Sequence, residues 1–150
     1  MSDQPSAGRI VGRTHSLPVR VYYEDTDFSG IVYHANYLKF LERGRSDFLR
    51  LAGVHHTQLL AEDTAIALLS VKVTFRNAAR IDDALEVRTL YEALRGPRII
   101  ISQTIVRGAA TIVEAAIEAC CISLTGRAKR APALLVERVS AYLPSATSSF

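Results

Sequence analysis

The residues best suited to chemistry are concentrated in residues 22–37, whose sequence is YYEDTDFSGIVYHANY. Glu24, Asp25 and Asp27 place three carboxylates within four positions, and His34 follows at the expected start of a helix. A carboxylate can serve as a general base or as a nucleophile. The N-terminus of a helix offers backbone N–H donors and a partial positive charge, which suit a developing oxyanion. Residues 22–37 therefore combine a candidate base or nucleophile with a candidate oxyanion site, and His34 could orient or polarise the reacting group.

The same side chains also have a purely structural interpretation. An Asp in such a loop often caps the following helix or closes an Asx-turn. A His at the start of a helix is often satisfied by local hydrogen bonds. Spacing alone therefore leaves Asp25, Asp27 and His34 open between a structural and a catalytic role.

Other sequence motifs of catalysis are not found. The sequence has no Gly-x-Ser-x-Gly motif, no phosphate-binding glycine loop, no dinucleotide-binding glycine motif and no His-Glu-x-x-His motif. His55 and His56 are interpreted as a solvated pair, and His15 carries no signal. Cys120 and Cys121 are adjacent and poorly placed to bond each other, so buried reduced thiols are favoured over a catalytic thiol. We expect no metal site.

The candidate site needs a strand before it and a helix after it. Residues 17–23 alternate as a strand does, and a polar loop follows them. From residue 35 to residue 51 the apolar period becomes helical. Gly44 lies on the apolar stripe of this helix, where its missing side chain permits close approach of the backbone. The other stripe residues are Tyr37, Phe40, Leu41, Phe48 and Leu51.

The rest of the chain is dominated by strand patterns. Alternation predicts four further strands, which span 69–76, 85–92, 98–107 and 110–125. Turn signals at Gly96 and Gly108 make neighbouring strands antiparallel. Short helices are expected near 57–62 and 134–142. The predicted fold class is α+β, with one long helix against a five-stranded antiparallel sheet.

The composition limits the class of protein. Hydrophobic residues make up 49% and charged residues 22% of the 150 positions, which excludes a disordered or collagen-like chain. We expect a flexible arm over 1–16, a single domain over 17–143 and a loose tail over 144–150. No apolar run approaches the ~20 residues of a membrane span, and the polar N-terminus is unlike a secretory signal. We therefore expect a cytoplasmic protein.

The charge is weakly basic, with 18 Lys and Arg residues against 15 Asp and Glu residues. Most of the basic residues are arginine, whose planar group suits phosphate and carboxylate. A solvated surface explains them equally well. The basic cluster at 127–130 is too short to define a nucleic-acid module, so we expect no nucleic-acid partner.

The strand patterns also predict self-association. Apolar residues occur on both faces of the predicted sheet, for example at Ile99, Ile100 and Ile101. One helix covers only one face, and a surplus apolar face is typically covered by another copy of the chain. We therefore expect a homo-oligomer, either a dimer or a homotetramer, and a sheet-edge dimer stacked face to face into a tetramer would cover both the edge and the face.

Residues 19–27 (VRVYYEDTD) and 30–37 (GIVYHANY) resemble the signature of the hotdog-fold 4-hydroxybenzoyl-CoA thioesterase family. The subgroup they resemble most is the bacterial acyl-CoA thioesterases associated with the Tol–Pal system. Further similarity lies at 40–45, 79–83 and 95–96, so the resemblance extends over about residues 17–131. It implies a hotdog fold, in which an antiparallel sheet wraps one long helix.

The resemblance also implies roles for individual residues. The catalytic carboxylate of the family is the second Asp of Asp-x-Asp, which implies Asp27 here and leaves Asp25 to shape the loop. Tyr23 and His34 match positions beside the acid, and the implied oxyanion donor is a backbone N–H at or next to His34. Phe28 departs from the small residues that are common at its position, which bears on the pocket mouth and the acyl-chain length.

The implied activity is hydrolysis of an acyl-CoA thioester to a free acid and coenzyme A. No metal or redox cofactor is implied, since coenzyme A is part of the substrate. Candidates to meet the coenzyme A phosphates, from the same or a neighbouring subunit, are Arg95, Arg98, Arg127 and Arg130. An alternative stays open because the basic balance suits an acidic partner. The chain would then be a scaffold that binds acyl carrier protein, or a thioesterase for acyl carrier protein thioesters with little acyl-CoA activity.

Overall fold

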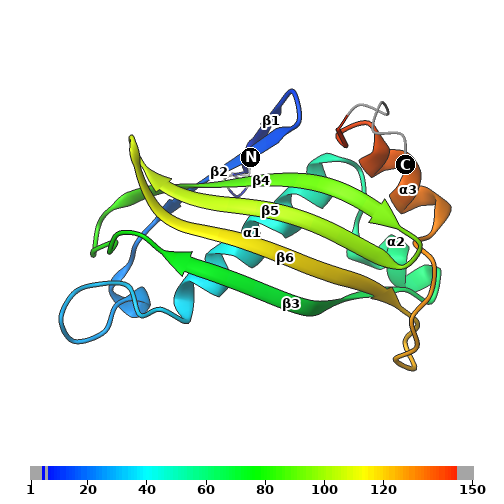
Figure 1. Ribbon diagram of the computed structural model, residues 1–150, viewed down its shortest axis with the longest axis horizontal. Helices are drawn as coiled ribbons and strands as arrows, with labels where there is room; N and C mark the ends of the chain where they lie inside the picture. Colours follow the sequence, from blue (N-terminus) through cyan, green and yellow to red (C-terminus); the bar gives the residue numbers. More distant parts are fainter. Residues whose placement is uncertain (1–4, 6, 145–150) are drawn as a thin grey trace.

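A computed structural model describes residue 5 and residues 7–144 (Figure 1). In this part of the chain, six strands form one antiparallel sheet in the order β1-β2-β4-β5-β6-β3. The strands are β1 (Arg9–Val11), β2 (Thr14–Arg20), β3 (Ala65–Phe75), β4 (Ala84–Arg95), β5 (Arg98–Arg107) and β6 (Ala110–Ile122). The helices are α1 (Asn36–Leu51), α2 (His56–Ala61) and α3 (Ala133–Ser140), and Tyr23–Asp25 forms the short 3-10 helix η1.

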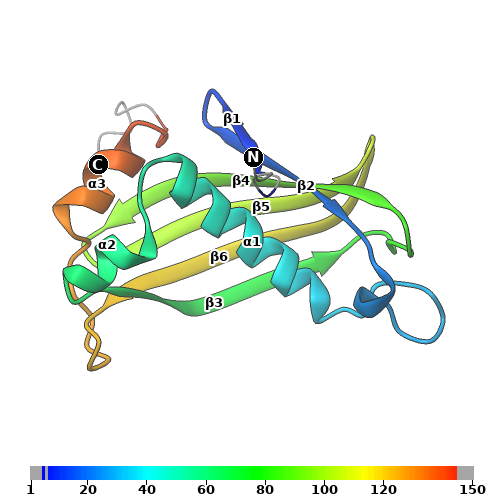
Figure 2. The same ribbon diagram turned by 180° about the vertical axis from the view of Figure 1, so that it is seen from behind.

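The long helix α1 crosses one face of the sheet, as Figure 2 shows, while α2 and α3 lie at one end. The predicted α+β class is confirmed, but the sheet has one strand more than predicted. The close approach expected at Gly44 is also confirmed, because a Cβ built there would lie 2.8 Å from Val87 Cγ1. Leu51, predicted to lie in the core, is 41% exposed. Its place on the stripe is taken by Ala52, which is 8% exposed and follows Phe48 by four residues.

The additional strand comes from the segment that was expected to be a flexible arm. Within 1–16, β1 pairs with the start of β2 as a hairpin. Arg13 anchors its turn, donating to the carbonyl oxygens of Tyr142 (2.9 Å) and Tyr91 (3.2 Å) and pairing with Glu92. Polar anchors of this kind leave no apolar pattern in the sequence. Residues 1–4 and 6, and the predicted tail beyond Pro144, lie outside the described residues.

The outer face of the sheet is more polar than the strand patterns suggested. It carries the ion pairs Arg98–Glu118, Arg88–Glu86 and Arg76–Glu114. Ile99 and Ile101 face the core and are buried, whereas Ile100 on the outer face is only half-buried. The surplus apolar face from which we expected stacking is therefore largely an ion-paired surface.

Both cysteines are free and buried, as predicted. Burial raises the pKa of the Cys121 thiol to about 11, so this group is a neutral thiol at physiological pH. Because thiolates rather than thiols are nucleophiles, the structure gives Cys121 a packing role.

Among the strands that the structure describes, β3 forms one edge of the sheet and pairs only with β6. It exposes the large apolar side chains of Leu68, Leu69 and Phe75. A long apolar edge strand is a ready template for pairing with another chain. No helix in the described part of the chain is long and apolar enough to cross a membrane.

Candidate active site

The loop that carries the candidate carboxylates is tightly held. After β2 and η1 the chain doubles back, with a bridge between Thr26 and Val32. The Asp27 N–H donates to the Ile31 carbonyl at 2.9 Å, and Gly30 turns the chain with a φ of 85°. A positive φ is easily adopted only by glycine, which explains this residue at the tip. The Val32 N–H then donates to the Ala79 carbonyl at 2.8 Å, tying the loop to the segment before β4.

Asp27 does not cap α1 but closes a small turn over Ser29. One carboxylate oxygen, Oδ1, accepts the Ser29 N–H at 2.8 Å and the Ser29 hydroxyl at 2.5 Å. These two hydrogen bonds, the one from the hydroxyl first, hold the pKa of Asp27 below its ordinary value, and the backbone of Ile31 adds a smaller effect in the same direction. Asp27 is therefore ionised at neutral pH. Both side-chain hydrogen bonds of Asp27 in the described residues go to Oδ1, so Oδ2 is the oxygen available to a substrate or a water molecule.

Asp25 has a different place in the loop. Its Oδ2 accepts the Tyr22 N–H at 2.8 Å, and its carbonyl accepts the Tyr33 N–H and the Asn36 side-chain amide. Asp25 thus joins η1 to the start of α1. This geometry agrees with a loop-shaping residue.

The start of α1 provides two available donors. The N–H groups of Asn36, Tyr37 and Leu38 donate to the three preceding carbonyls, those of residues 33, 34 and 35. The N–H groups of His34 and Ala35 have no protein acceptor within the described residues. Because the N-terminal end of a helix carries a partial positive charge, these two N–H groups form a candidate oxyanion site.

Tyr23 and His34, which the resemblance places beside the acid, belong to the same segment as Asp27 but are not hydrogen-bonded to it within the described residues. The His34 ring lies against Tyr33, with 4.4 Å between ring centroids, and edge-on to Phe75. Tyr23 is 81% exposed, and no hydrogen bond or ring contact within the described part of the chain joins the two side chains to Asp27. Phe28, beside Asp27, is fully exposed. The loop therefore presents an open aromatic rim.

The β4–β5 turn and the segment after β6 lie at the opposite end of the sheet from the loop that precedes α1 (Figure 1). These two segments carry the four candidate arginines. Arg95 and Arg98 flank the β4–β5 turn, and Arg127 and Arg130 follow β6. The two segments lie together, since the Ala131 N–H donates to the Gly96 carbonyl at 3.2 Å. Arg98 is engaged with Glu118. One copy of the chain therefore does not bring these arginines to Asp27.

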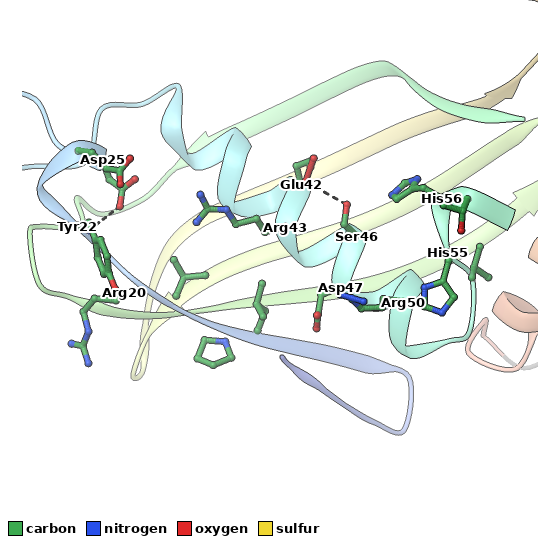
Figure 3. A pocket seen from close by; sticks show the side chains of 16 residues that line it. Arg20, Tyr22, Asp25, Glu42, Arg43, Ser46, Asp47, Arg50, His55 and His56 are labelled. Atoms are coloured by element: carbon green, nitrogen blue, oxygen red, sulfur yellow. Dashed lines mark hydrogen bonds between the residues drawn. The ribbon is translucent and has the colours of Figure 1, made fainter. Parts of the chain in front are cut away.

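A groove of about 850 Å³ runs along α1 between β2 and α2 (Figure 3). Its walls have mixed charge, with Arg20, Arg43 and Arg50 among several carboxylates. Its lining includes none of the three predicted catalytic residues. His55 and His56 lie in it, but no group of His, Cys, Asp and Glu side chains suited to a metal ion is found in the described residues.

Sequence reasoning missed two polar contacts. Ser29 is the hydrogen-bonding partner of Asp27, and the signal available for it was the Asp-x-Ser spacing of an Asx-turn. His15, without a signal in the sequence, is completely buried against Asp47 of α1.

Comparisons with known proteins agree with the geometry. The thioesterase-like superfamily matches residues 21–141. The acyl-CoA thioester hydrolase YbgC of Escherichia coli is 41% identical over 106 residues, covering 70% of this chain and 79% of that protein. The acyl-CoA thioesterase YbgC of Haemophilus influenzae is 38% identical over 110 residues, covering 73% and 81%. The crystal structure of a probable thioesterase from Bartonella henselae superposes with a TM-score of 0.75 at 39% identity, covering 79% of this chain and 99% of that one.

Proposed function

From the chain's membership in the thioesterase-like superfamily, we propose that this thioester hydrolase acts on acyl-CoA, with Asp27 as its catalytic carboxylate. The products are a free acid and coenzyme A. Two relatives with 38–41% identity carry names that specify acyl-CoA, which supports this substrate. The hotdog fold and the hydrolase class follow from the same family.

The role of Asp27 is supported by the different surroundings of its two carboxylate oxygens. Ser29 occupies Oδ1 with two hydrogen bonds, while Oδ2 is open. An ionised carboxylate held in this way can take a proton from water as the water adds to the thioester carbonyl. Alternatively, Oδ2 attacks the carbonyl, and water hydrolyses the resulting anhydride. In both routes the thiolate of coenzyme A leaves and takes up one proton.

The N–H groups of His34 and Ala35 stabilise the oxyanion that forms on the carbonyl. This role is supported by the position of both N–H groups at the start of α1, where neither has a protein acceptor in the described residues. In other enzymes, removal of one such donor lowers kcat by a factor on the order of 10²–10³. The ring of His34, fixed by Tyr33, and the exposed Tyr23 border the same opening.

The site is completed by a second copy of the chain. Antiparallel pairing of β3 with its symmetry mate places the end of one β3 beside the start of the other. Phe75, at the end of β3, contacts His34 at the start of α1. The Asp27 loop of one copy then approaches the end of the sheet where the partner holds its arginines. The residues that reach the coenzyme A phosphates in this arrangement are Arg95, Arg98, Arg127 and Arg130.

This edge-paired dimer has support that the predicted tetramer lacks. The edge strand exposes Leu68 and Leu69, whereas the outer face of the sheet carries ion pairs. No observation on the described residues favours the acyl carrier protein alternative. The cytoplasmic location, and the expected lack of a nucleic-acid partner and of a cofactor, stay predictions.

The test is release of free thiol from a panel of acyl-CoAs, short, long and aromatic, set beside the matching acyl carrier protein thioesters. We expect turnover of at least one acyl-CoA. Turnover of the carrier-protein thioesters alone would contradict the proposed substrate and favour the alternative.

A further inference from the structure

A second cavity, of about 200 Å³, lies between the C-terminal half of α1 and the sheet, on the β3 side of the helix. It adjoins the groove, since Glu42, Ser46 and His56 line both. Its walls are mostly apolar and include Ile66 and Leu68 of β3 and Ile99 and Ile101 of β5. A cavity of about 150 Å³ with such walls admits a benzene molecule. This cavity therefore suits an organic group of roughly six to nine non-hydrogen atoms.

One charged side chain, that of Arg45, is held at this apolar cavity in a half-buried position. Its Nη1 donates to Oε1 of Gln103 at 2.9 Å. Gln103 is itself buried and oriented, because its amide nitrogen donates to the Leu41 carbonyl at 2.9 Å and to the Thr89 hydroxyl at 2.8 Å. The guanidinium of Arg45 is thus fixed in place by a buried polar network.

Glu42 acts electrostatically on Arg45 but is not ion-paired with it, so the buried charge is only partly compensated. Within residues 7–144, no carboxylate lies within ion-pair distance of it. Burial lowers the pKa of Arg45, which reflects the cost of desolvating its charge. A guanidinium has five N–H donors, and Gln103 takes one of them. The remaining donors suit a ligand with acceptor oxygens.

Three other titratable groups line the cavity, Glu42, His56 and Tyr91. Tyr91 is buried, and burial raises its pKa, so it is neutral at physiological pH. Glu42 and His56 are exposed, and Glu42 accepts a long hydrogen bond from Ser46 at 3.4 Å. Water therefore screens Glu42 and His56 more than it screens Arg45. Arg45 is the charged group best shielded from solvent.

We propose that Arg45 is a specificity residue that binds the distal carboxylate of a short acyl group lodged in this cavity. The favoured substrates are then coenzyme A monothioesters of short dicarboxylic acids. This inference rests on the proposed function, including the edge-paired dimer. In that dimer the Asp27 loop of the partner faces the start of β3, where Ile66 and Leu68 line the cavity. The thioester lies at the partner's loop and the free carboxylate at Arg45.

The first experiment compares kcat/KM for glutaryl-CoA and valeryl-CoA, whose acyl chains both have five carbons and differ in the terminal carboxylate. Wild type should favour glutaryl-CoA. Arg45→Met should reduce the rate on glutaryl-CoA by about 10- to 100-fold, since a hydrogen bond to a charged group is lost, and should spare valeryl-CoA. Arg45→Lys should retain part of the preference. Arg43→Met, on the other side of α1, is the matched control and should leave the ratio unchanged.

A second measurement separates this inference from the catalytic one. Calorimetry on the same variants measures binding of two non-hydrolysable thioethers, S-(4-carboxybutyl)-CoA and S-pentyl-CoA. We expect wild type to bind the carboxylated thioether more tightly and Arg45→Met to lose that difference, even if no acyl-CoA is turned over. Equal binding of both thioethers by wild type, or equal loss of both in Arg45→Met, would overturn the role of Arg45 and assign it to the packing of α1. Failure of turnover alone would count against the proposed function instead.

Discussion

His15 and Asp47 form a buried hydrogen bond of 2.7 Å between Nε2 and Oδ2, although 32 positions separate them in the sequence. The same Asp47 oxygen accepts the Gly8 N–H at 2.9 Å. One carboxylate of α1 therefore holds both strands of the N-terminal hairpin. The other ring nitrogen of His15, Nδ1, is buried and has no hydrogen-bonding partner within the described residues.

Asp47→Ala should destabilise the fold, because it leaves a fully buried imidazole without any partner. We expect a loss of about 1–3 kcal/mol in the free energy of unfolding, measured by denaturant titration. Glu137→Ala, at an exposed carboxylate of α3, is the control and should change stability by less than about 0.5 kcal/mol. Equal effects of the two substitutions would show that the buried pair contributes nothing.

Gly44→Ala should also destabilise, against the usual preference for alanine in helices. A Cβ at Gly44 meets Val87 Cγ1 at 2.8 Å and Thr89 Oγ1 at 2.9 Å, so α1 or these side chains must shift. The overpacking should cost about 1–3 kcal/mol, more than the ~1 kcal/mol that alanine gains in helix propensity. Thermal denaturation checks the sign. A higher melting temperature for Gly44→Ala would contradict the close packing.

Ser29→Ala should shift the pH dependence of catalysis. The Ser29 hydroxyl is the first cause of the lowered pKa of Asp27, so its removal raises that pKa. Activity requires the ionised carboxylate and is lost as pH falls through the pKa of Asp27. The acid limb of the pH–rate profile should therefore move to higher pH. Ser140→Ala, at an exposed serine of α3, serves as the control, and an acid limb that stays in place in Ser29→Ala would contradict the role of this hydrogen bond.

Leu69→Glu should separate the dimer, because it places two like charges at the paired β3 edges. Light scattering should then give the mass of one chain, and thiol release should fall at least about tenfold at low protein concentration. Val136→Glu makes the same change at an exposed valine of α3 and should leave both readouts unchanged. An active wild-type monomer would contradict the two-copy site.

Much of this organisation was predictable because it follows local rules. The helical stripe around Phe40 and Phe48 and the alternation of β4 to β6 reflect burial on one face, which sequence period reports directly. The position of Asp27 came from the family resemblance, because spacing alone left it open between capping and catalysis. Its turn over Ser29 is the Asx-turn geometry that the sequence allowed.

What could not be predicted depends on contacts between distant residues. The β1–β2 hairpin is held by Arg13 and His15, whose partners lie between 32 and 129 positions away. In the sequence, Arg45 resembles any arginine on the exposed face of a helix. Its half-buried position depends on Gln103 of β5, which lies 58 positions away in the sequence and accepts its hydrogen bond. Long-range polar contacts of this kind carry no periodic signal in a single sequence.

The most direct test of the catalytic role is kcat for acyl-CoA hydrolysis by Asp27→Asn, measured beside Glu24→Gln. Glu24 is an exposed carboxylate three residues earlier, with no hydrogen bond in the described part of the chain, so it controls for the general loss of one negative charge. We predict that folded Asp27→Asn loses at least 10²-fold in kcat, as removal of a general base does, while Glu24→Gln stays within about twofold of wild type. A folded Asp27→Asn protein with near-normal kcat would contradict the assignment of Asp27.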